Sequence, residues 1–459
     1  MEAIDKFFTF INGYLWGPPM LILLFGTHLF LTFRLRIIQR YIPLAIKLSF
    51  KKTKEGEGDV SQFGALTTAL AATVGTGNIV GVATAVALGG PGAVLWCWMT
   101  GVFGIATKYA EALLSVKYRV RTENGTMAGG PMYVLERALG MKWAAVLFSI
   151  FTAIAAFGIG NTVQANAISS LAKEALGISP WITGIALTLF TGIVILGGIK
   201  SIARVCEALV PFMVVFYVLG CIIILIMGFS TLPATITLIF KSAFTGKAAA
   251  GGAAGSAIML AARFGIARGL FSNESGLGSA PIVAAAAQTK NPVRQALVSS
   301  TGTFWDTVVV CAMTGLVVVN AGAWQKGLEG AALTHSAFES IPYVGPIVLT
   351  GGLLIFVFST ILGWSYYGEK AVEYLFGEKA IKPYRVAWVI FVMVGSVTSL
   401  NVVWNFADAA NALMALPNLI ALLLLSGVVV SETRKYLWSG NLDESSEPVP
   451  EESAVMKTL

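Results

Sequence analysis

The sequence predicts an all-α membrane protein that crosses the bilayer about eleven times. Hydrophobic residues make up 56% of the 459 residues and charged residues only 12%, far below the roughly one-quarter charged fraction of soluble domains. Apolar windows of about 20 residues, the length that spans a bilayer, recur along the whole chain. Their approximate cores are 14–33, 65–90, 92–116, 143–170, 181–197, 207–228, 253–286, 296–319, 345–367, 384–400 and 404–430.

The distribution of basic residues predicts the orientation of the chain. If the N-terminus lies outside the cell, 23 of the 31 Lys and Arg residues fall in cytoplasmic segments and 5 in outer segments. Cytoplasmic loops are enriched in Lys and Arg, so we expect a multi-pass protein of the cell membrane with its N-terminus outside and its C-terminus in the cytoplasm. We expect the lipid bilayer rather than nucleic acid to be its partner, and no obligate protein partner.

Two of the predicted spans are interrupted by glycine-rich polar stretches. The second span contains VGTGNIVG, Val74–Gly81, and the seventh contains FSNESGLGSAP, Phe271–Pro281. These spans lie five apart and run in opposite directions, as an inverted repeat of five plus five spans requires. The predicted layout is an additional N-terminal helix (1–34), a basic cytoplasmic loop (35–64), a first repeat (65–228), a second repeat (252–430) and a short, solvated cytoplasmic tail (431–459).

A broken helix at membrane depth indicates a binding site, because its freed backbone groups must be satisfied by protein, water or ligand. Gly75, Gly77, Gly276 and Gly278 let the chain leave helical geometry at the two breaks. The first amides of a half-helix suit a carboxylate, whereas carbonyl and hydroxyl oxygens suit a sodium ion. A close helix crossing is the alternative explanation of one glycine-rich patch. Two patches in inverted positions favour a site for an amino acid and a cation.

The motifs around the first break resemble those of a known transporter family. The stretch GTGNIVGVATAVALGGPGAVLWCWMTGVFG, followed by KYAEALLSVKYR and later by FSNESGLGSAP, resembles the alanine or glycine:cation symporter family. That family is similar in fold to the amino acid-polyamine-organocation and neurotransmitter-sodium-symporter carriers. The resemblance implies a carrier that imports small neutral amino acids, alanine or glycine, together with sodium, by alternating between outward-open and inward-open states.

The resemblance also implies the residues of the site. The amides of Thr76 and Gly77 would hold the substrate carboxylate, and Asn78 would lie near the amino acid or a cation. The implied substrate contacts from both breaks are Thr73, Gly75, Thr76, Gly77, Asn78, Phe271, Ser272, Asn273, Ser275 and Gly276. Sodium would lie between the second and ninth spans, where the implied ligands are the carbonyls of Ala71 and Val74 together with Ser359, Thr360 and Gly363.

Two further spans contribute candidate residues. Thr360 and Trp364 are four residues apart on one helix face, so we expect Trp364 to close the pocket beside Thr360 and to favour small substrates. Gln164, in the fourth span, is either a substrate contact or an ordinary interhelical hydrogen-bonding residue, since amides often join membrane helices.

Charged residues within spans are functional candidates, because a buried charge at membrane depth is costly. Glu274 lies in the second break and is either a partner of a cation or ammonium group, a gate, or a cap for the amides of its own half-helix. Arg268 and Asp408 are candidates for an ion pair that would act as an outer gate. Asp306, Glu111 and Glu207 are expected to be helix-packing residues or interfacial partners of nearby Lys and Arg, and Glu111 with Lys108 is expected to belong to a network at the inner rim.

A carrier, a channel and an enzyme would each leave a different pattern in the sequence. A channel would show a ring of like residues from identical subunits, and an enzyme would show a nucleophile with a base, such as GxSG with His, or HExxH; the sequence contains neither pattern. The broken helices favour a carrier without enzymatic activity. Hard oxygen ligands favour sodium as the coupled ion, and Glu274 leaves proton coupling as the alternative.

Overall fold

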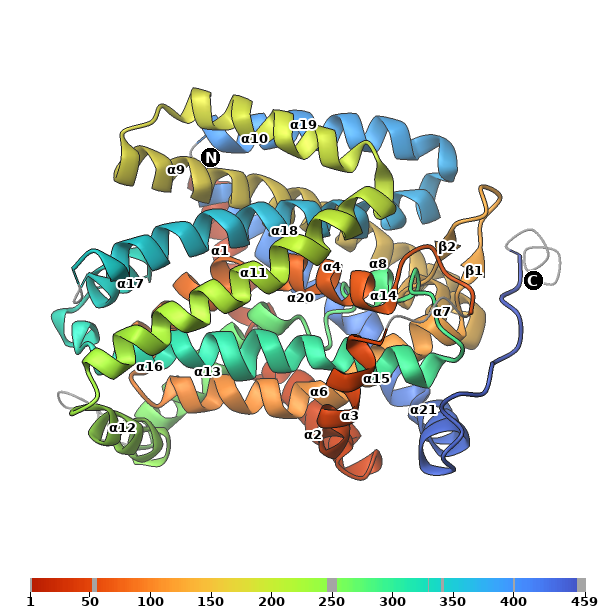
Figure 1. Ribbon diagram of the computed structural model, residues 1–459, viewed down its shortest axis with the longest axis horizontal. Helices are drawn as coiled ribbons and strands as arrows, with labels where there is room; N and C mark the ends of the chain where they lie inside the picture. The colour runs from red at the N-terminus through yellow and green to blue at the C-terminus, as the bar shows by residue number, and fades with distance from the viewer. Residues whose placement is uncertain are drawn as a thin grey trace.

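The computed structural model describes residues 2–51, 56–245, 254–328, 330–339, 342–398 and 401–451, and most of these residues are helical. The helices pack into one bundle with the two breaks near its centre (Figure 1). Helix α6 packs against α13 and α15, α11 against α18, α20 against α8, and α10 against α19. A two-stranded antiparallel sheet, β1 (Val120–Arg121) with β2 (Met127–Ala128), lies at one end.

The first half of the described chain forms twelve α-helices. Proline stands in the first turn of several of them, where its missing amide costs nothing. The helices are α1 (Glu2–Leu15), α2 (Pro18–Arg34), α3 (Ile42–Ser49), α4 (Gln62–Thr73), α5 (Val82–Gly89), α6 (Ala93–Lys117), α7 (Pro131–Leu139), α8 (Lys142–Ala155), α9 (Val163–Leu176), α10 (Pro180–Ile195), α11 (Gly198–Met227) and α12 (Leu232–Phe244).

The second half adds nine α-helices, and π-helical turns occur in both halves. The helices are α13 (Ala254–Asn273), α14 (Pro281–Ala284), α15 (Pro292–Thr303), α16 (Ala312–Asn320), α17 (Gly330–Phe338), α18 (Val344–Phe376), α19 (Ile381–Val397), α20 (Asn401–Leu424) and α21 (Ser426–Thr433). π-Helical segments, which recur at functional sites, occupy Gly77–Gly81, Ala156–Thr162, Phe304–Cys311 and Arg434–Trp438. Helices α3, α12 and α17 lie in segments that were expected to be loops.

Several described helices are long and apolar enough to cross a membrane. Five do so alone: Lys142–Lys173, Gly198–Met227, Pro292–Asn320, Val344–Phe376 and Glu378–Val397. Three more spans result if each bent pair counts as one: Pro18–Arg34 with Ile38–Ser49, Gln62–Thr73 with Gly77–Gly89, and Asp408–Leu424 with Ser426–Trp438. The other predicted spans fall on α6, α10 and α13, so the count of eleven stays a prediction.

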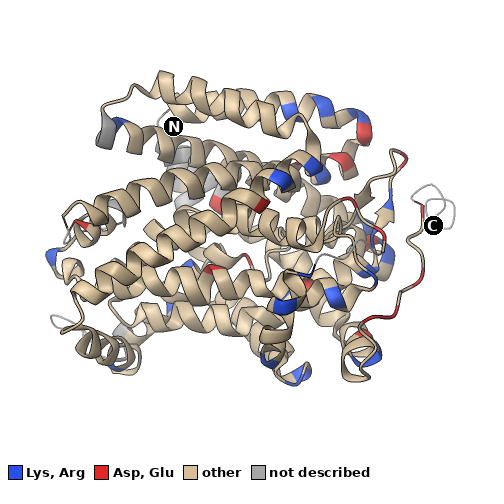
Figure 2. Ribbon diagram, in the orientation of Figure 1, with Lys and Arg blue, Asp and Glu red and all other residues tan. Residues whose placement is uncertain are grey.

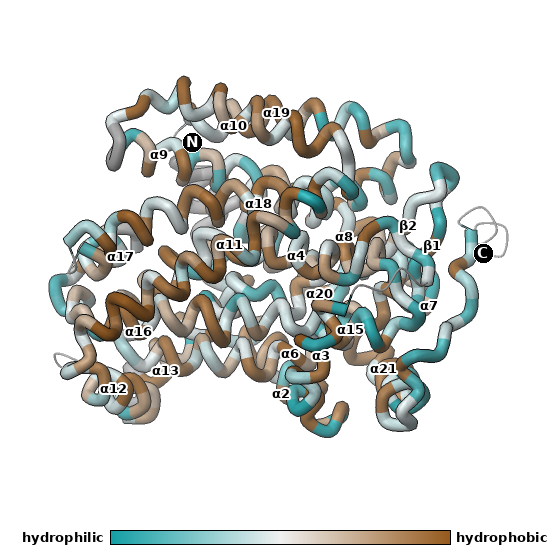
Figure 3. Tube along the Cα trace, in the orientation of Figure 1, coloured by the Kyte–Doolittle hydropathy of each residue, from teal (hydrophilic) through white to brown (hydrophobic). Residues whose placement is uncertain are grey.

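The surface of the bundle fits a membrane environment. Large apolar side chains such as Phe190, Ile193 and Ile226 are more than half exposed, which water would disfavour and lipid would not. Hydrophobic segments extend along α11, α16 and α18 (Figure 3). Lys and Arg gather at the end that holds β1, β2, α21 and the C-terminus (Figure 2). The chain is therefore a multi-pass membrane protein.

Both predicted helix interruptions are present. Helix α4 ends at Thr73, and the helical segment that resumes at Gly77 is bent by 54° from it. Helix α13 ends at Asn273, and α14 begins only at Pro281. Gly276 and Gly278 between them have φ values of +91° and +88°, a left-handed conformation that glycine adopts without steric cost.

Arg119 holds the chain just before α4 and just after α14. Its guanidinium donates hydrogen bonds of 2.8 Å to the carbonyls of Ala285, Ala287 and Glu57. Burial lowers the pKa of Arg119 to about 10, so its guanidinium stays charged at neutral pH. The segments before α4 and after α14 are thereby joined to the end of α6.

The C-terminal tail is expected to be solvated, and most of its described residues after Gly440 are exposed while a few hydrogen bonds hold it along this same end of the bundle. Asn291 donates to the carbonyls of Leu442 and Glu444, and Arg294 forms an ion pair of 2.8 Å with Asp443. The Arg121 amide donates to the Pro450 carbonyl. Hydrogen-bonding groups on β1 and at the start of α15 therefore hold the described part of the tail. Residues 452–459 of the predicted tail and residues 252–253 of the predicted second repeat lie outside the described residues.

Arg119→Met tests the role of this junction. The substitution leaves three carbonyls without their charged donor, and we expect a loss of about 3 kcal/mol or more in stability. Thermal unfolding of the purified protein in detergent measures it. Arg121→Met, which removes one exposed ion pair of 3.2 Å with Glu57, is the control and should shift the unfolding temperature little. Equal shifts for the two variants would contradict the assignment.

Candidate functional site

A small cavity lies between the two helix breaks. Its lining comes from five parts of the chain: the first break, the π-helical turn with the start of α9, the second break, helix α18 and helix α20. The lining residues are Ala72, Thr73, Gly75, Thr76, Gly77, Ile159, Gln164, Phe271, Glu274, Thr360, Trp364 and Asn411. About 20 Å³ of the cavity is open to the centre of a water-sized sphere, which is room for about one water molecule.

The first break supplies backbone donors to this cavity. Thr76 and Gly77 line it and stand in the first turn of the second half-helix, where backbone N–H groups have no partner within the helix. A Cβ on Gly77 would lie 3.2 Å from the Phe271 ring, and one on Gly75 would lie 2.7 Å from the Thr360 hydroxyl. Glycine at these two positions therefore lets the second break and α18 approach the backbone.

Asn78 holds the first break in its bent form. Its side-chain oxygen accepts the Gly75 amide at 2.8 Å, and its Nδ2 donates to Asp306 Oδ1 at 2.7 Å. Ser272 and Thr307 donate to the other Asp306 oxygen, at 2.9 and 2.6 Å. Asp306 is thus a helix-packing residue, one of the two expected roles, and it forms no ion pair with Lys or Arg among the described residues, because three uncharged donors occupy its carboxylate. Asn78 and Ser272, both predicted substrate contacts, point to Asp306 and do not line the cavity.

The predicted sodium ligands lie where α4 meets α18. The Ser359 hydroxyl is 3.3 Å from the Ala71 carbonyl, and the Thr360 hydroxyl is 3.4 Å from the Val74 carbonyl. Gly363 permits this approach, since a Cβ there would lie 2.6 Å from the Ala72 amide nitrogen. Two carbonyls and two hydroxyls, all uncharged oxygens, converge at the end of the first half-helix.

Three side-chain groups on the cavity wall can accept hydrogen bonds from an ammonium group. Gln164 donates its Nε2 to the Ile159 carbonyl at 2.9 Å, while its Oε1 is buried without a partner among the described residues. Asn411 Oδ1 is likewise buried, with no partner in the described part of the chain. The Glu274 carboxylate is the third. Asn411 was not predicted, because no local motif marks it in α20.

The second break is folded by its own hydrogen bonds and by Glu111. Glu274 has a φ of +55° and its carboxylate accepts the Ser279 hydroxyl, so it bridges across the loop. Glu111 Oε1 accepts the amides of Gly276 and Gly278 at 3.0 and 3.1 Å and the Asn418 side chain at 2.7 Å. Among the described residues Glu111 forms no direct ion pair with Lys or Arg, because backbone amides and an uncharged side chain take its Oε1, and Lys108 interacts with it only electrostatically.

Three more predicted contacts from the second break lie outside the cavity. The Asn273 side-chain oxygen accepts the Ser275 amide at 2.9 Å, and the Ser275 hydroxyl lies 3.1 Å from that of Thr303. Gly276 contributes its amide to Glu111. Among the described residues, Phe271 and Glu274 are the members of this break that line the cavity.

Arg268 and Asp408 face a second, wider cavity on the other side of Phe271. Its walls include Trp16, Arg263, Arg268, Phe271 and Asp408, and about 370 Å³ of it is open to the centre of a water-sized sphere. Within the part of the chain that the structure describes, Arg268 and Asp408 form no ion pair. The predicted contact between them is thus open here, across a cavity that shares Phe271 with the smaller one.

Trp364 is held against the cavity by Gly160. The Trp364 side chain is fully buried, and a Cβ on Gly160 would lie 2.3 Å from its Cβ and 2.5 Å from its Cγ. Only a residue without a side chain leaves room for the indole at this point of the π-helical turn.

Gly160→Ala should displace Trp364 into the cavity. Overpacking of this kind costs about 1–3 kcal/mol, too little to unfold the protein, and we expect the binding of a solute in the cavity to fall at least about tenfold. Ligand binding to the purified protein measures the effect. Gly26→Ala in α2, where nothing lies within 4 Å of the added Cβ, is the control. Wild-type binding by Gly160→Ala would show that Trp364 does not shape the site.

Comparison with known sequences places the chain in a family. The profile of the sodium:alanine symporter family matches residues 1–449. A sodium/alanine symporter, AgcS, of Methanococcus maripaludis is 54% identical over 437 residues, which is 93% of this chain and 96% of that protein. A probable sodium/glutamine symporter, GlnT, of Bacillus subtilis is 36% identical over 445 residues, 95% of this chain and 91% of that protein.

Solved structures with the same overall fold include two transporters. A sodium-coupled sialic acid symporter aligns with a TM-score of 0.50 at 12% identity and covers 91% of this chain and 86% of its own. A manganese transporter of Eremococcus coleocola aligns with a TM-score of 0.50 at 15% identity, over 87% of this chain and 85% of its own. These identities support the fold alone. From the family profile and the relatives, the chain is a transporter rather than an enzyme and belongs to the sodium:alanine symporter family.

Proposed function

We propose that the protein imports small neutral amino acids, alanine and glycine, in symport with sodium by alternating access. The observation that supports this most is the meeting, in one cavity, of the first-turn amides of Thr76 and Gly77 with three ammonium acceptors. Next to it lie the four oxygens where α4 meets α18. A zwitterion and a monovalent cation need these two sets of groups.

The cavity residues divide between the parts of an α-amino acid. The Thr76 and Gly77 amides bind the carboxylate, with the positive end of the half-helix behind them. Gln164 Oε1, Asn411 Oδ1 and Glu274 accept hydrogen bonds from the ammonium group. Three groups remain for the side chain: Ile159, Phe271 and Trp364. Because they leave little room, a methyl group or a hydrogen atom fits, and a branched chain of four carbons does not.

Sodium binds at the carbonyls of Ala71 and Val74 with Ser359 and Thr360, and Gly363 sets the helix spacing there. Uncharged oxygens suit a monovalent ion that must also be released, because adding carboxylates would strengthen binding. Val74 belongs to the same break as Thr76, so ion binding orders the backbone that the amino acid needs. This shared segment couples the two solutes.

The arrangement in the membrane follows the predicted inverted repeat. Residues 65–228 and 252–430 form the two repeats, 1–34 is the additional helix, 35–64 is the cytoplasmic loop and 431–459 is the cytoplasmic tail, with the N-terminus outside. Substrate enters through the wider cavity, and Phe271 separates it from the binding cavity. Closure of Arg268 onto Asp408 then forms the outer gate.

Coupling to protons is the second candidate, and the position of Glu274 favours it. This carboxylate is buried and lines the binding cavity, so it can take up a proton there. In that mechanism Glu274, rather than the oxygens between α4 and α18, links the ion gradient to transport.

Uptake of labelled alanine into proteoliposomes tests the proposed function. With the membrane potential clamped, we expect uptake to require an inward sodium gradient, to be absent in an equal potassium gradient, and to be competed by glycine but not by leucine. Uptake that follows a proton gradient and ignores sodium would transfer the coupling role to Glu274. No uptake under either gradient would contradict both candidates.

Thr360→Ala tests the sodium site. Loss of one oxygen ligand should raise the sodium concentration for half-maximal uptake about tenfold or more, while the protein stays folded. Ser365→Ala is the matched control, because its hydroxyl bonds only the Leu362 carbonyl of its own helix, at 2.6 Å. An unchanged sodium dependence in Thr360→Ala would exclude Thr360 as a ligand.

A further inference from the structure

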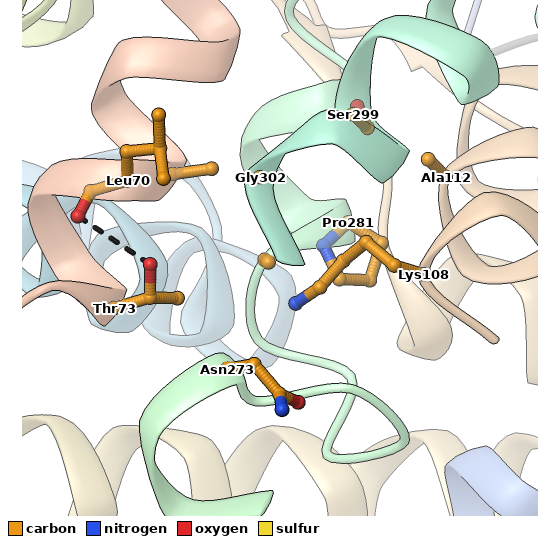
Figure 4. A pocket seen from close by; sticks show the side chains of 10 residues that line it. Leu70, Thr73, Lys108, Ala112, Asn273, Pro281, Ser299 and Gly302 are labelled. Carbon is orange, nitrogen blue, oxygen red and sulfur yellow. Dashed lines mark hydrogen bonds between the residues drawn. The ribbon is translucent and has the colours of Figure 1, made fainter. Parts of the chain in front are cut away.

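A second small pocket adjoins the binding cavity near the end of α4 and the start of α14. It lies between α4, α6, the second break and α15, and it shares Thr73 with the binding cavity (Figure 4). About 10 Å³ of it is open to the centre of a water-sized sphere, which is room for one atom the size of a water oxygen. The lining residues are Ala69, Leu70, Thr73, Lys108, Ala112, Asn273, Ala280, Pro281, Ser299 and Gly302.

Lys108 is the polar group that this pocket leaves unsatisfied. It is 4% exposed, and its ammonium nitrogen has no hydrogen-bond partner among the described residues. Figure 4 shows the side chain extending into the space between α4 and α15. A buried ammonium group without an acceptor is costly, so it indicates a ligand that supplies acceptors.

The other polar side chains around the pocket are also donors. Asn273 Nδ2 is buried without a partner among the described residues. The Ser299 oxygen accepts a hydrogen bond of 3.0 Å from Gln295, so its own proton remains to be donated. The Thr73 hydroxyl donates to the Leu70 carbonyl at 3.4 Å. No carboxylate is among the described residues that line this pocket, and the donors of Lys108, Asn273 and Ser299 favour an anionic group.

Among the described residues, the nearby carboxylates accept no hydrogen bond from Lys108. Glu111, Glu274 and Asp306 are close enough to interact with it electrostatically. Each of them accepts hydrogen bonds from other donors instead. Glu111 accepts from two loop amides and Asn418, Glu274 accepts from Ser279, and Asp306 accepts from three uncharged side chains. Their charges make burial of Lys108 tolerable and also keep an anion from binding tightly.

We propose that the pocket around Lys108 is a weak anion site on the inward side of the binding cavity. Its ligand is a small anionic group: either the α-carboxylate of an amino acid leaving the binding cavity, or a free chloride ion. In the first case Lys108 and Asn273 receive the carboxylate when it leaves the Thr76 and Gly77 amides. The carboxylate case rests on the proposed function, whereas the chloride case does not depend on it.

Chloride binding is tested without any transport measurement. The unfolding temperature of the purified protein is followed while chloride replaces gluconate, at constant sodium and ionic strength. A chloride ion at Lys108 should raise the unfolding temperature of the wild-type protein and leave that of Lys108→Met unchanged, because chloride binds only the folded state.

The carboxylate is tested by exchange across proteoliposomes of known orientation. If it is the ligand, Lys108→Met should weaken the apparent affinity for internal alanine at least about tenfold and leave that for external alanine near the wild-type value. Ser299→Ala should show a smaller effect in the same direction, which keeps the test valid if Lys108→Met fails to fold. Lys117→Met is the matched control, because Lys117 lies on the same helix as Lys108, α6, and pairs with Glu432 of α21.

The two measurements also separate this proposal from the proposed function. A chloride effect lost in Lys108→Met supports the free ion even if the wild-type protein moves no alanine. Absence of a chloride effect, together with internal and external affinities in Lys108→Met and Ser299→Ala that match the wild type, would overturn the anion site.

Discussion

The whole structure depends on satisfying backbone groups that two broken helices leave free in an apolar environment. Two buried carboxylates do this, each from a helix outside the break it serves. Asp306 fixes Asn78, which in turn holds the Gly75 amide, and Glu111 takes the amides of Gly276 and Gly278. With those groups occupied, the amides of Thr76 and Gly77 remain for a ligand. The acids thus shape the site without lining it.

Small residues let the surrounding helices come close enough to enclose the breaks. Gly363 brings α18 against α4, and Gly160 makes room for Trp364. The same contacts place the hydroxyls of Ser359 and Thr360 beside carbonyls of the first break. Because one bent segment faces both the proposed amino-acid cavity and the proposed sodium ligands, it is the segment through which our proposal couples the two sites.

The sequence predicted the breaks and not what stabilises them. Glycine and asparagine within an apolar span are a local signal, so both interruptions and the facing of Thr360 and Trp364 to one cavity could be foreseen. More than a hundred residues separate Asp306 from Asn78 and Glu111 from Gly276, to which they are hydrogen-bonded. A similar distance along the chain separates Asn411 from Gln164, with which it lines the cavity. No local pattern in the sequence reveals such partners. The tail is mostly exposed, as its acidic composition predicted, but no local pattern revealed that Asn291 and Arg294 bind it.

A map of the protein determined with sodium and alanine bound tests the central claim most directly. The account predicts density for alanine between the two breaks, with its carboxylate within hydrogen-bonding distance of the Thr76 and Gly77 amides and its methyl group facing Trp364. Alanine density elsewhere, for example beside Arg268 and Asp408, with those two amides contacting only protein or water, would contradict the claim that the broken backbone is the binding site.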